Sequence, residues 1–263
     1  MTEFRPGRFQ ILPTVVKNLI IINVLVQLAQ YLFRSSSVIN LEDIFALHSW
    51  QSPLFKPWQM LTHMFMHDPD PDHYFAHIIF NMFALWMFGS VLENLWGPKR
   101  FLTFYLICGL GAAFCHLTVL YFENQHMISL YNSLDRNSPD FLFNLKHFIE
   151  KYNLGREGYI SMDMARAVVD DNLNSSTIGA SGAVFGCLAA FGYLFPNTYV
   201  YLIFPPIPIK AKWFVIGYTA VELFSTLNAS AGDNVAHVAH LGGALAGFLM
   251  VYFWNKPKKK TFY

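Results

Sequence analysis

Long apolar blocks separated by shorter polar segments form the main pattern along this chain. About 20 mostly apolar residues in a helix are enough to cross the hydrocarbon core of a bilayer. The pattern therefore predicts an all-α polytopic membrane protein, with six transmembrane helices and an extramembrane insertion between the third and the fourth. The six predicted helices cover residues 14–33, 77–96, 101–121, 179–195, 213–227 and 235–254.

The segment 123–177 has the composition of a soluble protein, and we expect it to form the insertion within a single membrane domain that covers residues 1–263. Apolar residues at helical spacing predict a helix over 141–152, and Ser161 is a candidate cap for a second helix over 161–172. Two further segments lie between the predicted helices. Residues 34–76 are expected to form an interfacial loop, and the proline-rich residues 196–212 an apolar hairpin.

Composition agrees with a membrane protein. Of the 263 residues, 54% are hydrophobic and 13% are charged, against about 25% charged residues in soluble domains. The net charge of +1 says nothing about nucleic acid, but no basic stripe with interleaved aromatics appears, so no nucleic-acid partner is predicted. The three cysteines fall inside apolar runs and are interpreted as small buried residues, without disulfide, metal or cofactor roles; they are Cys108, Cys115 and Cys187.

Basic residues set the expected orientation, because they concentrate in cytoplasmic segments. With six helices and a cytoplasmic N-terminus, 11 of the 18 basic residues fall on the cytoplasmic side. They are Arg5, Arg8, Lys17, Lys99, Arg100, Lys210, Lys212, Lys256, Lys258, Lys259 and Lys260. Both termini are then cytoplasmic. The first apolar stretch has no clear cleavage site and is interpreted as a retained helix, and the lack of a transit-type leader favours a bacterial inner membrane.

Ser181 is the first candidate for chemistry. It lies among Gly179, Gly182 and Gly186 at the expected start of the fourth helix, where unpaired backbone N–H groups favour negative charge. The glycines would let another helix pack closely. Alone, this motif is more typical of a helix cap with a packing face than of a nucleophile.

A partner base comes from the sixth helix. His240 precedes Gly243 by three residues and shares its side of the helix, and Gly243 and Gly247 form a second smooth face. Close approach of the two glycine faces would bring Ser181 and His240 together as nucleophile and general base. His237 is the rival base, one turn nearer the loop.

The second helix supplies candidate oxyanion donors. His77 and Asn81 are four residues apart and share one helix face. With the Ser181 backbone N–H they could stabilise a tetrahedral oxyanion, although such a pair could also simply connect two helices.

The remaining histidines and two glutamates allow other roles. His63 and His67 could share a zinc ion, but no HExxH motif or fixed acidic partner completes the site, so no metal is predicted. Glu93, before the inner turn at Gly97, is interpreted as structural. Glu222 within an apolar helix requires a partner.

Together these motifs resemble the rhomboid family of intramembrane serine proteases. The match rests on Gly179-Ala-Ser181-Gly, on Ala239-His240-x-x-Gly243-x-x-x-Gly247 and on His77-x-x-x-Asn81. The resemblance implies a Ser181–His240 dyad without an acidic third member, an oxyanion hole from His77, Asn81 and the Ser181 backbone, and cleavage of single-pass membrane proteins in or near their transmembrane segment. It also favours His240 over His237 as the base.

Three features depart from the family pattern. Trp58 is followed by Gln59 where the family often has arginine, and Phe185 stands where some members have tyrosine. The insertion has no counterpart in minimal members. Two other functions stay open: a catalytically silent protein that binds membrane clients, which the complete set of catalytic groups disfavours, and a transporter, which the lack of a repeat disfavours.

Overall fold

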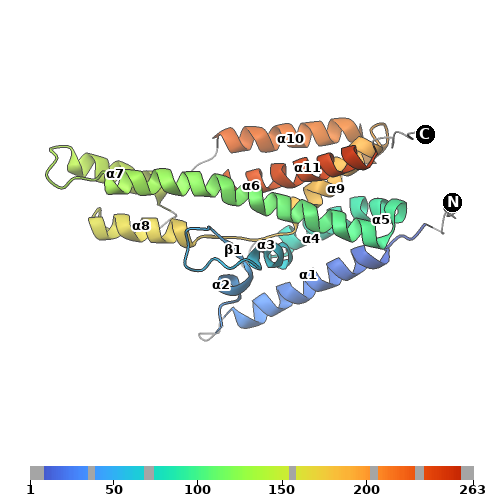
Figure 1. Ribbon diagram of the computed structural model, residues 1–263, viewed down its shortest axis with the longest axis horizontal. Coiled ribbons are helices and arrows are strands. Elements are labelled where there is room, and N and C mark those ends of the chain that lie inside the picture. Colours follow the sequence, from blue (N-terminus) through green and yellow to red (C-terminus); the bar gives the residue numbers. More distant parts are fainter. Residues whose placement is uncertain are drawn as a thin grey trace, which may run out of the picture.

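The computed structural model describes residues 9–34, 39–67, 74–153, 158–201, 207–228 and 234–255 (Figure 1). Helices dominate it. The long helices are α1 (Thr14–Phe33), α4 (Tyr74–Ala84), α6 (Pro98–Asn132), α7 (Phe141–Tyr152), α8 (Met162–Asn174), α9 (Ser181–Leu194), α10 (Ala211–Asn228) and α11 (Asn234–Trp254). The short ones are α2 (Leu41–Phe45), α3 (Gln59–Thr62), the 3-10 helix η1 (His63–Phe65), the π-helix η2 (Leu85–Gly89) and α5 (Ser90–Trp96).

Four described stretches are long and apolar enough to cross a membrane. They are Thr14–Phe33, His77–Trp96, Pro98–Asn132 and His237–Asn255. Helix α9 is apolar but has only 14 residues. The chain is therefore built as a helical membrane protein, and the count of six spans stays a prediction.

Two small sheets modify the expected all-α class. Strand β1 (Leu47–His48) pairs antiparallel with β2 (Ser176–Thr177), and β3 (Tyr199–Tyr201) pairs antiparallel with β4 (Pro208–Lys210). The first sheet fastens the long first loop to the segment before α9. The second forms within the expected apolar hairpin, whose Pro205 and Pro206 lie outside the described residues. Strand pairs of two or three residues leave almost no periodic signal in a sequence.

Helix α6 corrects the expected boundary of the insertion. It has 35 residues, about 52 Å of helix at the usual rise, which exceeds the roughly 30 Å of a bilayer's hydrocarbon core. The expected end at 121 was therefore too early. Residues 123–132 lack the apolarity of a span but continue the same helix, because their own apolar residues pack against α7 and α8.

The distal part of α6 forms a separate core with α7 and α8, which we call the cap (Figure 1). Its buried side chains are Met127, Leu145, Phe148, Ile149, Tyr152, Ala165, Val168 and Val169. Ser161 begins α8 by accepting a hydrogen bond from the Met164 backbone N–H at 3.1 Å. In Figure 1, α7 and α8 lie at one end of the molecule, while α1 begins and α11 ends at the other.

The centre of the bundle is a contact between backbones on α6, α9 and α11. A β-carbon at Gly243 would overlap the Gly182 carbonyl, and one at Gly247 would lie 2.6 Å from the Gly186 carbonyl oxygen. On α6, Cys108 packs against Gly186. Small residues therefore allow these helices to approach one another more closely than side chains would permit.

Glu93 has the structural role expected of it. One carboxylate oxygen accepts the Val15 N–H at 2.9 Å and the other accepts the Val16 N–H at 2.8 Å. These N–H groups belong to the first turn of α1, where no intrahelical acceptor is available. The buried carboxylate thus caps α1 and ties it to α5.

Candidate active site

Ser181 begins α9 deep within the bundle. Helix α11 begins at Asn234, well before Gly243, whereas α9 begins directly before Gly182. Because Gly182 meets Gly243, the start of α9 lies about 12 Å farther along the bundle than the start of α11, at 1.5 Å per residue. Ser181 therefore lies inside the bundle, about 12 Å from the level at which α11 begins.

Glycine at 179 shapes the approach to Ser181. Its φ of 124° lies in a region that side chains disfavour, and its N–H donates to the His63 carbonyl at 2.9 Å. A β-carbon there would lie 3.5 Å from both the Ser181 Oγ and the His77 Nε2. The role of Gly179 is thus in the turn, not in helix packing, and the turn places His77 and Ser181 around one point.

The His240 ring lies on the side of α9 that carries Ser181. It stacks on Phe185 at 4.3 Å between ring centroids and 5° between planes, and Phe185 is one turn after Ser181. Gly182 also packs against Ala239 and Gly243, which flank His240. Within the described ranges no hydrogen bond joins the Ser181 Oγ to His240, a common condition of catalytic pairs without substrate.

The two candidate oxyanion donors differ in their surroundings. The Asn81 amide donates to the His77 carbonyl at 3.0 Å, within its own helix. The His77 ring lies near Ser181, as described above, and packs edge-on against His67 at 5.3 Å. Asn81 has a second amide hydrogen, so this contact leaves one donor for a ligand.

A small cavity of about 30 Å³ adjoins the serine. Its walls come from the first loop, α6, the turn before α9, α9 and α11. They include His63, Met64, Gly109, Ala112, Thr177, Ile178, Gly179, Ser181, Gly182, Ala183 and Ala239. The volume suits about one water molecule.

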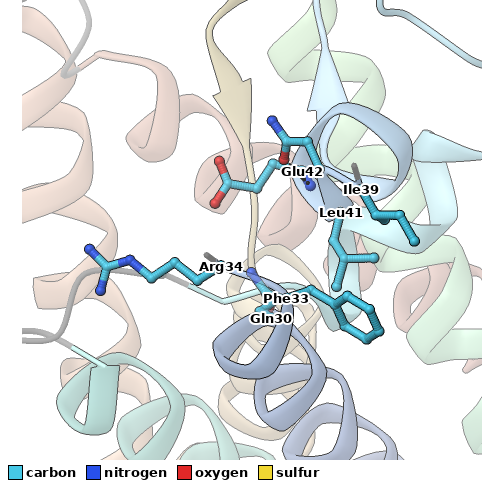
Figure 2. Close-up of a pocket in the computed structure, with 7 residues that line it drawn as sticks. Gln30, Phe33, Arg34, Ile39, Leu41 and Glu42 are labelled. Atoms are coloured by element: carbon cyan, nitrogen blue, oxygen red, sulfur yellow. Dashed lines mark hydrogen bonds between the residues drawn. The ribbon is translucent and has the colours of Figure 1, made fainter. Parts of the chain in front are cut away.

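A larger cavity, of about 290 Å³, lies between the end of α1 and α2 (Figure 2). Gln30, Phe33, Arg34, Ile39, Asn40, Leu41 and Glu42 line it. None of the expected site residues is among them, so its size does not make it the candidate site.

Glu222, on α10, is the functional neighbour that sequence reasoning missed. Its Oε2 lies 2.6 Å from the His237 Nδ1 and 3.2 Å from the His240 Nδ1. Among the described residues these three also form the one group whose ligand atoms lie close enough to hold a metal ion, within 4.8 Å of one another. The need of Glu222 for a partner was visible in the sequence, but the identity of the partner was not.

The ring nitrogens of the first-loop histidines differ in their contacts, and both nitrogens of His67 are buried without a hydrogen-bond partner among the described residues. The His63 Nδ1 lies 2.8 Å from the Gln59 carbonyl oxygen. Burial lowers the pKa of His63 to about 4. Burial, and then the nearby His77, lower the pKa of His67 to about 4 as well. Both rings are therefore neutral at pH 7.

Gln59 occupies the position where the family often has arginine, and it is fully buried. Its amide nitrogen donates to the carbonyls of Asp43 at 3.1 Å and Leu54 at 2.9 Å. Its oxygen accepts the backbone N–H of Lys56 at 3.0 Å. A neutral amide thus holds the first loop together.

The model of the rhomboid domain family matches residues 54–129 and 152–256 of this chain, more than half of its length. The chain belongs to the rhomboid family. The match is interrupted at 130–151, the end of α6 and most of α7, so the interruption falls within the cap.

Three curated relatives support this membership at low identity. The chain is 27% identical over 187 residues to "Rhomboid protein 1, mitochondrial" of Saccharomyces cerevisiae, covering 71% of this chain and 40% of the relative. It is 26% identical over 210 residues to an uncharacterised mitochondrial rhomboid protein of Schizosaccharomyces pombe, covering 76% and 52%. It is 24% identical over 210 residues to the rhomboid protease GluP of Bacillus subtilis, covering 78% and 27%.

The names of these relatives bear on the expected location. Two are mitochondrial proteins and one is bacterial. An integral membrane protein is supported, but a bacterial inner membrane is not favoured over a mitochondrial one. The chain spans about half or less of the relatives' lengths, so their whole activities do not transfer to it.

Proposed function

We propose that this protein is an intramembrane serine endopeptidase that cleaves single-pass membrane proteins in or near their transmembrane segment. The observation that carries the proposal is the His240 ring stacked on Phe185, one turn from Ser181 on the same helix. Membership of the rhomboid family and a relative named as a protease support it.

In the proposed reaction, His240 acts as general base and Ser181 as nucleophile. The imidazole takes the hydroxyl proton while Oγ attacks the substrate carbonyl, and the imidazolium then protonates the leaving amine. Water hydrolyses the acyl-enzyme by the same route. The cavity beside Ser181 has room for about one water molecule.

The oxyanion would form near the start of α9. The Ser181 N–H belongs to the first turn of that helix, where N–H groups have no intrahelical acceptor. The His77 ring adjoins this point, and Asn81, on the same helix, has a second amide hydrogen that its bond to the His77 carbonyl does not use. Such fixed donors usually supply the largest electrostatic contribution to acyl transfer.

Two features of the chain support a proposed membrane placement. The start of α1 and the end of α11 lie at one end of the molecule (Figure 1), which accords with an even number of spans. We assign that end to the cytoplasmic or equivalent inner side, where most basic residues fall. The cap, with its ordinary side-chain core, then lies outside the bilayer on the opposite side.

The decisive experiment compares four proteins in detergent with a transmembrane substrate: wild type, Ser181→Ala, His240→Ala and His237→Ala. We expect cleavage by wild type, cleavage at a reduced rate by His237→Ala, and none by the other two. Cleavage that survives Ser181→Ala would overturn the proposal.

A fluorophosphonate probe provides the control for substrate choice. Labelling of wild type but not of Ser181→Ala would show an activated serine even where the chosen substrate is not cut. A folded wild type that neither cleaves nor labels would instead indicate a protein that binds membrane clients without cutting them.

A further inference from the structure

Glu222 is a buried carboxylate within α10, in contact with two histidines of α11. An ionised side chain at such a site is costly unless it is paired. Its hydrogen bond to the His237 Nδ1, at 2.6 Å, provides a partner. This contact alone would explain a structural link between α10 and α11.

A second contact gives the carboxylate a further role. The His240 Nδ1 is buried and has no hydrogen-bond partner among the described residues. The same Glu222 oxygen lies 3.2 Å away, within reach but out of line for a hydrogen bond. A small rotation of the carboxylate or the ring would satisfy both histidines, because a carboxylate accepts several hydrogen bonds.

The orientation of the ring decides which nitrogen is left for catalysis. Nδ1 faces Glu222 on α10, so Nε2 is the nitrogen available to Ser181 on α9. Stacking on Phe185 fixes the plane of the ring. A proton held on Nδ1 would therefore leave Nε2 unprotonated, which is the tautomer that a general base needs.

We propose that Glu222 is a positioning residue for His240, so that the Ser181–His240 pair works as part of a Ser–His–Glu arrangement. This inference rests on the proposed protease function. Glu222 accepts the hydrogen bond of Nδ1–H and remains ionised throughout. When Ser181 Oγ bonds to the substrate carbonyl carbon, its proton moves to Nε2 and the carbonyl electron pair moves to the oxygen. The carboxylate then stabilises the imidazolium.

His237 has a supporting role in this arrangement. His237 lies one turn before His240 on α11. Its hydrogen bond to Glu222 holds the Glu222 carboxylate beside His240. Since His237 does not contact the reacting atoms, its loss should weaken the placement of Glu222 without removing the charge.

The test is Glu222→Gln, which keeps the shape and the acceptor oxygen and removes the charge. We expect kcat to fall about 100-fold, a smaller loss than the roughly 10⁴-fold known when a triad's acid is replaced by its amide. KM and the unfolding temperature should change little. Glu222→Asp keeps the charge with a shorter reach and should recover at least 10-fold of the lost kcat. Full kcat in folded Glu222→Gln would overturn the inference.

Glu93→Gln is the matched control, because Glu93 is also a buried carboxylate but caps α1. We expect it to lower stability and leave kcat per folded molecule near the wild-type value. If Glu222→Gln behaves like Glu93→Gln, Glu222 is structural and the inference is wrong.

The rate of fluorophosphonate labelling gives a second readout that needs no substrate and counts only folded molecules. It should fall in Glu222→Gln in parallel with kcat. Failure of the proposed function would give a different result. A folded wild type that neither cleaves nor labels would contradict both the protease function and the role of Glu222. If wild type and Glu222→Gln are equally active, only the proposed role of Glu222 is wrong.

Discussion

The bundle around α9 and the cap are packed in opposite ways. In the bundle, Gly182 and Gly186 bring the backbone of α9 against α11, and no large side chain lies between them. In the cap, Leu145, Phe148 and Val168 fill the space between α7, α8 and the end of α6. Water drives the second kind of packing through apolar burial. Within lipid that force is absent, so close backbone contact takes its place.

The two regions also differ in their relation to the candidate site. The contact between glycines fixes the distance between the helices of Ser181 and His240, so any widening moves the candidate catalytic groups apart. The cap holds none of the candidate site residues. Substitutions that widen the bundle should therefore lower the cleavage activity, whereas substitutions in the cap core should mainly lower the stability of the cap.

The largest expected effect is that of Gly243→Val. A side chain there would overlap the Gly182 carbonyl, so α9 and α11 must separate. We expect complete loss of substrate cleavage and a lower unfolding temperature. Gly217→Val is the matched control, because nothing lies within 4 Å of its β-carbon position on α10. Equal activity of the two variants would show that the close contact is unimportant.

Leu145→Ala tests whether the cap affects only stability. The side chain is 1% exposed in the cap core, and its removal should destabilise the cap by about 3 kcal/mol. Chemical denaturation should show an earlier transition for the cap. Cleavage per folded molecule should stay within about twofold of wild type. A much larger loss, with the cap still folded, would mean that the cap contributes to the site.

The stability of the first loop should depend on pH in acid, because its histidine His67 is buried, whereas the exposed histidine His147 of the cap should add no such dependence. The unfolded chain takes up a proton on His67 near pH 6.5, but in the native state burial holds its pKa near 4. Stability is thus complete above pH 6.5 and is lost as the pH falls from 6.5 toward 4, by about 1.4 kcal/mol per pH unit at full effect. His63, whose pKa is also about 4, contributes a slope of the same kind, so His67→Gln should reduce the slope in thermal unfolding by about half.

His147→Gln is the control for the acid experiment, since His147 is exposed on α7. It should leave the slope between pH 6.5 and 4 unchanged. A flat slope in wild type would argue that His67 becomes protonated without cost in the native state.

The smallest effect is expected from Ser161→Ala, which removes the side-chain cap of α8. Loss of an N-cap costs about 1 kcal/mol. The change should appear as a slightly earlier cap transition in denaturant, with unchanged cleavage. Ser129→Ala, at an exposed position within α6, provides a comparison away from a helix cap.

The sequence by itself determined the local features of this protein. Apolar length indicated α1 over Thr14–Phe33, and apolar spacing indicated α7 over Phe141–Tyr152. Glycine spacing predicted smooth faces on α9 and α11, and the residues of the candidate site could be named from motifs. These signals are local, because helix period, caps and small-residue spacing each depend on only a few neighbouring residues.

Only the tertiary structure decided what lies next to what. It extended α6 beyond its apolar part, because apolar residues near Met127 pack on helices far along the chain. It showed that Gln59 binds the first loop through backbone groups, and that Glu222 lies beside both histidines of α11. Such contacts join residues distant in sequence, so no periodic pattern records them. The carboxylate beside His240 could therefore be found only once α10 and α11 were placed together.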